Sequence, residues 1–139
     1  MDILIPNEIA SFFTVEDFAD YPFVRIPQKF ADSRGVISNI ADGTIGDVAV
    51  ISSVQNSVRA NHFHIKDWHL SYLIQGEMQY FWKNSFDEPW QDIKVVSGTL
   101  IYTPPKVLHK MEFKSDSIFI AISALSRKSQ NYEADTIRI

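Results

Sequence analysis

The chain has 139 residues, the size of one ordinary domain, and a formal net charge of −4 at pH 7. Hydrophobic residues make up 45% of it and aromatic residues 13%, a composition unlike that of disordered chains. The negative charge argues against a general nucleic-acid binder, although a few local arginines would suffice for a phosphorylated small molecule. The chain has no cysteine, which excludes disulfides, thiolate metal sites and thiol nucleophiles.

The N-terminal stretch MDILIPNEIASFF contains the only helical candidate, Asn7–Phe13, with Asn7 as its N-cap. The stretch has no basic region and no small-residue cleavage site, so it does not resemble a signal peptide. No run of residues approaches the length of apolar chain that spans a membrane. We therefore expect no membrane partner and a cytoplasmic protein.

Strand signals dominate the rest of the chain, as short β-branched or aromatic runs separated by Gly, Asn, Asp, Pro and Ser. Gln75-Gly76 is typical of a tight hairpin turn, and Asn84–Pro89 of a longer hairpin loop. No helix of crossover length intervenes, so the fold class is all-β, a sandwich or barrel. The predicted strands are Gly35–Ile40, Asp47–Val54, Ser57–His64, His69–Ile74, Glu77–Lys83, Asp92–Val96, Thr99–Thr103, His109–Lys114 and Ser117–Ala124.

One domain is predicted over residues 1–139, with its core at about residues 22–125. The part after Ser126 is polar and weakly patterned, so it is interpreted as a tail along the surface or a dimer arm. The apolar segment Ile3–Phe13 and the Trp-rich strands could cover exposed sheet edges, which favours a homodimer.

The four histidines, all that the chain has, fall in a pattern that suggests one shared site. In a strand successive side chains alternate between faces, so His62 and His64 point the same way. His69 opens the next predicted strand, and His109 opens a later one. We therefore predict that the four imidazoles converge in the interior.

The spacing of these histidines resembles the first motif of the cupin family, G-x5-H-x-H-x3–4-E-x6-G. His62, His64 and Gly76 occupy their expected places. Asn56 stands where the motif has its leading Gly, and His69 stands where it has Glu.

The second cupin motif, G-x5-P-x-G-x2-H, is similar to the run from Gly98 through Pro104 to His109, with Lys106 in place of the Gly. The two motifs together absorb every histidine of the chain. The resemblance implies a single-domain cupin, the double-stranded β-helix or jelly-roll barrel.

In cupins these four positions hold a divalent metal, so the resemblance implies a metal at His62, His64, His69 and His109. Imidazoles bind Fe, Ni, Cu, Mn or Zn well. Four imidazoles would close a tetrahedral zinc site, whereas an octahedral metal would keep two positions open for a substrate. Histidines that act as acids and bases without metal, and an inactive cupin, are the alternatives.

A narrower resemblance is to the nucleotide-sugar 3,5-epimerases and 3,4-ketoisomerases. It is carried by Asp32-Ser33-Arg34-Gly35, by Arg59-Ala60-Asn61-His62-Phe63-His64, where Ala60 replaces the usual Gly, and by Pro105-Lys106-Val107-Leu108-His109. It implies proton transfer next to the carbonyl of a deoxy-keto sugar attached to a nucleoside diphosphate.

The same resemblance implies roles for individual residues. The histidine that matches His62 is the general base, with His64 as the other catalytic candidate, and the arginines that match Arg34 and Arg59 bind diphosphate. A tyrosine often assists from the opposite wall, and Tyr72, Tyr80 and Tyr102 are the candidates. An imidazole that titrates near neutral pH suits this chemistry.

A metal on His62 would occupy its lone pair, so the metal role and the base role of His62 exclude each other. Two other functions stay open at this stage. One is a metal-dependent cupin enzyme, a dioxygenase or isomerase, on another small molecule. The other is a non-catalytic cupin that binds a metabolite.

Overall fold

A computed structural model describes residues 24–25, 28–41 and 45–139. Each of the ranges predicted as strands contains one, which confirms the all-β fold class. The elements are β1 (Val24–Arg25), β2 (Gln28–Asp32), β3 (Gly35–Asn39), β4 (Asp47–Ser53), β5 (Val58–His64), β6 (His69–Gln75), β7 (Glu77–Lys83), β8 (Gln91–Val96), β9 (Leu100–Thr103), β10 (Leu108–Phe113), β11 (Ser117–Ser123), α2 (Ser129–Asp135) and β12 (Thr136–Arg138). The predicted helix Asn7–Phe13 and the apolar segment Ile3–Phe13 lie outside the described residues.

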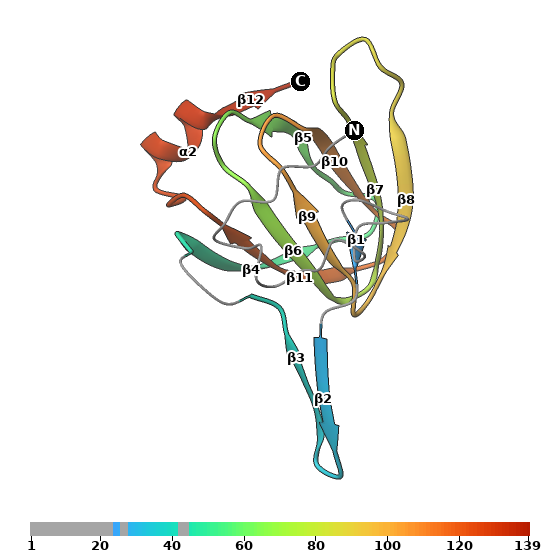
Figure 1. The fold of residues 1–139 in the computed structure, drawn as a ribbon. Coiled ribbons are helices and arrows are strands. Elements are labelled where there is room, and N and C mark those ends of the chain that lie inside the picture. The colour runs from blue at the N-terminus through green and yellow to red at the C-terminus, as the bar shows by residue number, and fades with distance from the viewer. Residues whose placement is uncertain (1–23, 26–27, 42–44) are drawn as a thin grey trace.

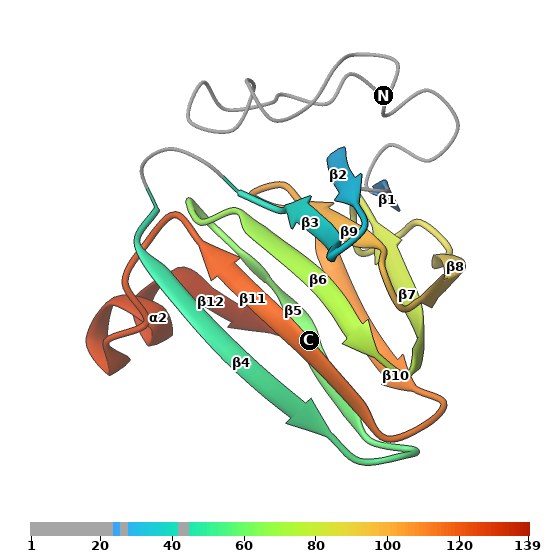
Figure 2. The same cartoon turned by 90° about the horizontal axis from the view of Figure 1, so that it is seen from below.

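Two antiparallel five-stranded sheets face each other, as Figure 2 shows, in the orders β1-β9-β6-β11-β4 and β12-β5-β10-β7-β8. Strand β7 alternates strictly between half-buried and buried residues, so Met78, Tyr80 and Trp82 point inward. They pack against Phe113 of β10 and Phe119 of β11 in the core between the sheets. This is the jelly-roll arrangement predicted from the cupin motifs.

The sheet that contains β6 and β9 is also buried on its outer face. There Leu70 and Tyr72 of β6 pack with Leu100 and Tyr102 of β9 in a second apolar cluster. The pairing of Leu70 with Tyr102 and of Tyr72 with Leu100 places these four side chains on one face. The opposite face of β6, which carries His69, Ser71 and Leu73, is turned to the interior.

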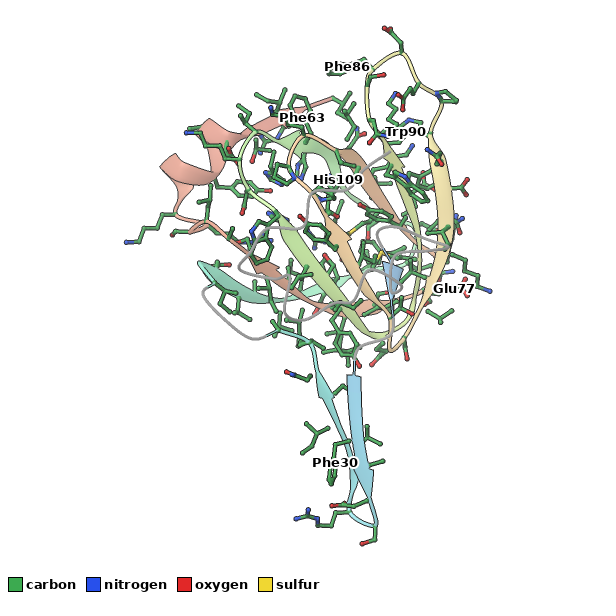
Figure 3. The ribbon with its side chains drawn as sticks, in the orientation of Figure 1. Phe30, Phe63, Glu77, Phe86, Trp90 and His109 are labelled. Atoms are coloured by element: carbon green, nitrogen blue, oxygen red, sulfur yellow. The ribbon has the colours of Figure 1, made fainter. Side chains whose placement is uncertain are left out.

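Strands β2 and β3 form a separate hairpin that extends away from the barrel (Figure 1). It exposes Phe30, Val36 and Ile37, each more than half accessible. Figure 3 shows Phe30 well outside the barrel. The turn of this hairpin contains Arg34, which donates hydrogen bonds to Asp32 and pairs with it at 2.6 Å.

The C-terminal part, interpreted from the sequence as a tail along the surface or a dimer arm, contains regular structure that pairs with its own barrel. After β11 the chain forms α2 and then β12, which pairs antiparallel with β5. Asp135 and Thr136 are buried at the junction of these two elements. The Asp135 carboxylate accepts hydrogen bonds from the backbone N–H groups of Lys66 and Asp67, at 2.8 and 3.0 Å. Within the described residues, no helix is long and apolar enough to cross a membrane.

Asn56, Ala60 and Lys106 all stand where the motifs usually have glycine, and all three have left-handed backbone. Their φ angles are 70°, 64° and 67°. The chain therefore keeps the backbone geometry that the glycines serve but places side chains on it. For a residue other than Gly or Asn this conformation costs roughly 1–2 kcal/mol. Ala60 and Lys106 thus hold local strain close to the histidines.

We predict that Ala60→Gly stabilises the protein, because glycine has no Cβ to strain at a positive φ. The expected rise in the free energy of unfolding is about 0.5–1 kcal/mol, measured by urea unfolding. Ala134→Gly is the matched control, since Ala134 is exposed in α2. That substitution should lower stability by about 1 kcal/mol. A loss of stability in both variants would contradict the assignment of strain to Ala60.

Candidate functional site

Strand β5 carries two inward-facing histidines because its side chains alternate between the two faces of the sheet. A β-bulge lies next to them in the same strand. His62 pairs with His109 of β10, whereas Ala60 pairs with the next residue, Lys110, so that Asn61 is the extra residue on β5. Such a bulge re-aims the strand at a site. His62, His64 and His109 are all less than one-tenth exposed. Figure 3 shows His109 within the barrel.

The histidine rings form a contiguous cluster, as predicted. The ring centroid of His62 lies 4.5 Å from that of His64 and 4.8 Å from that of His109. His69, from β6 in the facing sheet, lies 4.3 Å from His64 but 6.5 Å from His109. The centroids of His64 and His109 are 5.7 Å apart. Two groups of potential ligand atoms lie close together, one from His62, His64 and His109, called the triad below, and one from His64, Asp67 and His69.

Hydrogen bonds from the C-terminal segment define the tautomer of His64. The Thr136 hydroxyl donates its hydrogen to the carbonyl of Tyr132 at 2.6 Å. It can therefore only accept at its second contact, 3.2 Å from His64 Nδ1. His64 then carries its proton on Nδ1 and its lone pair on Nε2. That Nε2 is buried and has no hydrogen-bond partner among the described residues.

His109 is oriented in the same way. Its Nδ1 lies 3.0 Å from the carbonyl oxygen of Val107 and donates to it, which leaves the lone pair on Nε2. One nitrogen from each of His62, His64 and His109 lies within 4.8 Å of the others. Neutral imidazoles whose other nitrogen is held by an oxygen are typical metal ligands. The donor set, with the unpartnered Nε2 of His64, fits a divalent metal.

His69 differs from the triad because it has a carboxylate partner. Its Nε2 lies 2.9 Å from Oδ2 of Asp67, and both side chains are buried. The other oxygen of Asp67 accepts a hydrogen bond from the backbone N–H of Leu125 at 3.0 Å. A carboxylate can only accept, so Nε2 of His69 donates to Asp67, and the lone pair of the neutral ring is then on Nδ1. The sequence analysis treated His69 only as a metal ligand and did not single out this use of Asp67.

A cavity of about 130 Å³ opens beside the cluster and is lined by His62, His69 and His109 but not by His64. Arg59 also lines it, as predicted for a substrate-binding residue. The Arg59 guanidinium is fixed by donation to Ser53 Oγ at 2.6 Å and to the Ser52 carbonyl at 2.8 Å. The cavity therefore combines imidazoles inside with a positively charged group near its opening.

Two residues of the C-terminal segment complete the cavity wall, and the sequence analysis missed both. Arg127 and Tyr132 line the cavity, and the ring of Tyr132 lies 6.4 Å from that of His62. The Arg127 Cζ lies 5.7 Å from the centre of the Tyr132 ring. The sequence of this segment contains one structural signal, the alternation of the last residues, TIRI. It is too short to predict a strand, and it does not bear on Arg127 or Tyr132.

Four residues predicted to contact substrate do not line this cavity. Tyr72 and Tyr102 belong to the cluster on the outer face of their sheet, because alternation along β6 and β9 turns them away from His69. Tyr80 is buried in the core and shares a hydrogen bond with Thr103 Oγ1, at 2.7 Å. Arg34 lies on the projecting hairpin and not at the cavity of its own chain. The structure therefore does not bring these four residues to the cavity of their own chain, and their roles in substrate binding stay predictions.

Burial keeps the triad uncharged. It lowers the pKa of His62 and of His109 to about 3, and that of His64 to about 2. In each case loss of solvation is the largest cause, and repulsion between neighbouring imidazoles adds to it. All three are therefore neutral at pH 7, the state in which imidazole can bind a metal or accept a proton.

We predict that acid destabilises the metal-free protein from about pH 6.5 downward. The unfolded chain binds protons at these histidines near pH 6.5, whereas the folded chain does so only near pH 3, so stability is complete above pH 6.5 and falls below it. Each histidine contributes up to about 1.4 kcal/mol per pH unit. Urea unfolding of chelator-treated protein between pH 7 and 5 should show this slope, and His62→Gln should reduce it by one histidine's share. An unchanged slope in the variant would contradict the prediction.

No protein-family model matches the chain, and no curated protein matches it in sequence. Solved structures do match it in fold. The 3,4-ketoisomerase QdtA from Thermoanaerobacterium thermosaccharolyticum, as a variant in complex with TDP-4-keto-6-deoxyglucose, is 18% identical and has a TM-score of 0.68 over 84% of this chain and 86% of that one. The TDP-fucose-3,4-ketoisomerase WlaRA from Campylobacter jejuni is 12% identical, with a TM-score of 0.69 over 84% and 87%.

A third match is the dTDP-4-dehydrorhamnose 3,5-epimerase from Sulfolobus tokodaii, 16% identical, with a TM-score of 0.67 over 84% of this chain and 75% of that one. Likeness at this level of identity establishes the fold. The predicted jelly-roll fold is therefore confirmed: the chain has the fold of these nucleotide-sugar ketoisomerases and epimerases.

Proposed function

We propose that the protein is an isomerase or epimerase that moves a proton next to the carbonyl of a nucleotide-linked deoxy-keto sugar. The observation that carries the proposal is the combination of a carboxylate-paired histidine and a fixed arginine on one small cavity. A structure of similar fold holds TDP-4-keto-6-deoxyglucose, which is a ligand of that class.

The size of the cavity defines which part of such a substrate could enter. An apolar cavity of roughly 150 Å³ accommodates benzene. A cavity of about 130 Å³ therefore suits a six-membered ring but not a nucleotide. The sugar ring would enter the cavity, and the diphosphate and nucleoside would lie at its opening, where Arg59 is exposed.

His69 is the residue best suited to act as the base. Its Nδ1 would remove a proton from the carbon next to the carbonyl, giving an enediolate, and would return that proton to the former carbonyl carbon while the neighbouring hydroxyl gives up its own proton to form the new carbonyl. Epimerisation would instead require a second group to protonate the same carbon from its opposite face. Asp67 would stabilise the imidazolium formed in between, as a buried carboxylate does for a catalytic histidine. His62, the base implied by the resemblance, also lines the cavity but has no carboxylate partner in the described part of the chain.

We propose that His62, His64 and His109 hold a divalent metal, with Fe, Ni, Mn and Zn as candidates. Such a metal supplies a positive charge that polarises a carbonyl oxygen. With the lone pair of His62 engaged in this way, proton transfer falls to His69. The two predicted roles of the histidines are then divided between different residues.

The predicted homodimer and the cytoplasmic location stay predictions. The apolar residues exposed on the β2–β3 hairpin, together with Val48 and Val50 on the edge strand β4, offer a surface for a second copy.

We predict solvent exchange at the carbon that reacts. Incubation with TDP-4-keto-6-deoxyglucose in heavy water should place deuterium on ring carbon C3 or C5, detected by NMR. His69→Gln should abolish incorporation, and Asp67→Asn should slow it, because loss of a general base costs about two to four powers of ten in rate. His62→Gln and His64→Gln both alter the triad, but of the two residues only His62 lines the cavity. Loss of incorporation in His62→Gln that does not occur in His64→Gln would therefore come from loss of a base and not from loss of the metal.

Incorporation that survives in His69→Gln but is lost in His62→Gln would return the base role to His62. Absence of deuterium in several nucleotide-linked keto-sugars would overturn the proposed function. The convergent triad would then favour a metal-dependent enzyme on another small molecule, and oxygen consumption would identify a dioxygenase.

We also predict about one divalent metal per chain in protein purified without a metal-affinity resin. Added metal should raise the Tm of chelator-treated protein, because a ligand that binds only the folded state stabilises it. Thr136→Val removes the acceptor that orients His64 and should weaken metal affinity about 10- to 100-fold. His69→Gln is the matched control and should keep the metal. A Tm that ignores Fe, Ni, Mn and Zn would contradict the proposed metal site.

A further inference from the structure

Only two buried side-chain nitrogen or oxygen atoms in the described part of the chain lack a hydrogen-bond partner, and both belong to this site. One is Nε2 of His64, the proposed metal ligand. The other is Nε of Arg127, on the cavity wall. Buried polar groups are nearly always satisfied, so an orphaned donor next to a cavity indicates a missing acceptor. The metal cannot be that acceptor, since a guanidinium repels it.

The nearest anion does not satisfy Arg127. Its Nε lies 3.3 Å from Oδ2 of Asp47, within range of an ion pair, but the N–H makes no hydrogen bond to that carboxylate. Asp47 therefore offsets the charge of Arg127 without using this donor. Arg59, the other cation on the cavity, is held by a hydroxyl and a carbonyl, which carry no charge.

The cavity wall carries two guanidinium groups and no carboxylate among the described residues that line it. Asp47, behind the lining, offsets the charge of Arg127, whereas the described partners of Arg59 are uncharged. Burial keeps the imidazoles of His62 and His109 neutral. The lining therefore has a net positive charge. A positive, partly desolvated wall favours an anionic ligand. The planar guanidinium group can donate two parallel hydrogen bonds to the oxygens of a phosphate or a carboxylate.

Arg127 is also held in place before any ligand arrives. The chain that leads to it is tied to the barrel by hydrogen bonds from the backbone N–H of Ala124 to the Trp68 carbonyl and of Leu125 to Asp67. The guanidinium itself lies near Oδ2 of Asp47 and 5.7 Å from the centre of the Tyr132 ring. These contacts limit its positions and so reduce the conformational freedom that is lost on binding.

We propose that Arg127, supported by Tyr132, is an anion-binding group that the C-terminal segment adds to the cavity, where it acts with Arg59 on a phosphate group of the ligand. For its natural ligand this inference rests on the proposed function, in which the diphosphate lies at the cavity opening. The segment after β11 is then part of the binding site and not only its cover.

The test is calorimetric titration of thymidine diphosphate and of inorganic diphosphate into wild-type protein and variants at one ionic strength. Wild type should bind both. Arg127→Gln should lose at least about tenfold in affinity for each, because a charge-assisted contact disappears. Arg127→Lys, which keeps the charge without the fork, should lose less. Thymidine alone should bind weakly and with no dependence on Arg127.

Two controls separate this role from a structural one. Arg138→Gln alters an exposed arginine of the same segment, paired with Glu133 at 2.9 Å, and should leave diphosphate affinity unchanged. Asp47→Asn breaks the ion pair of Arg127 but keeps its guanidinium, so binding should persist. Thermal unfolding of every variant confirms that the fold is retained.

Wild-type protein that binds neither anion, or Arg127→Gln that binds them as wild type does, would overturn the inference. An equal loss in Asp47→Asn would overturn it too, because the effect would then come from the ion pair. Diphosphate binding that depends on Arg127 without any deuterium exchange would support the inference and count against the proposed function. Deuterium exchange by Arg127→Gln with an unchanged KM would support the proposed function and count against the inference.

Discussion

Several imidazoles can share the interior of this barrel only if none of them is protonated. Burial lowers the pKa of each triad histidine by several units, and each further charge would be opposed by its neighbours. Neutrality has a second consequence. A neutral imidazole has one N–H donor and one nitrogen acceptor, and when buried each needs its own partner. Val107 and Thr136 take the donors of His109 and His64, so that both lone pairs are directed to the centre. The readiness of the site for a metal or a proton follows from this arrangement.

The orientation of the triad depends on the C-terminal part of the chain, whose strand β12 is the edge strand of one sheet. Thr136 orients His64, and it does so because β12 pairs with β5 in a register that sets Thr136 opposite His64. Asp135 locks that junction by accepting two backbone hydrogen bonds from the turn that leads to His69. In Figure 1, α2 and β12 cover the end of the barrel away from the projecting hairpin. The barrel brings the histidines together. The C-terminal segment orients His64 through Thr136 and adds Arg127 and Tyr132 to the cavity wall.

The sequence was sufficient for the strands β3 to β11, the fold and the convergence of the four histidines, because these depend on alternation and on spacing, but β1, β2 and β12 were not predicted. Even the departures from the cupin motifs were informative, since Asn56, Ala60 and Lys106 keep the backbone angles of the glycines they replace. The same alternation places Tyr72, three residues after His69, on the opposite face of β6, so its predicted role at the site was not consistent with the predicted strand. Arg127, Tyr132 and Thr136 act through contacts with distant strands, which a polar and weakly patterned tail does not reveal.

The barrel strands carry the histidines, whereas the C-terminal segment carries two further residues of the cavity wall. This separation affects how proteins of this architecture can diverge. The residues that make proton transfer or metal binding possible are built into paired strands, where a change of one residue would turn a side chain to the wrong face. Arg127 and Tyr132 instead belong to a stretch that follows the last strand of the barrel core and is joined to it by a few hydrogen bonds. Insertions or exchanges there would alter which ligands are accepted while the chemistry at the centre is preserved, so new specificities could evolve without rebuilding the barrel.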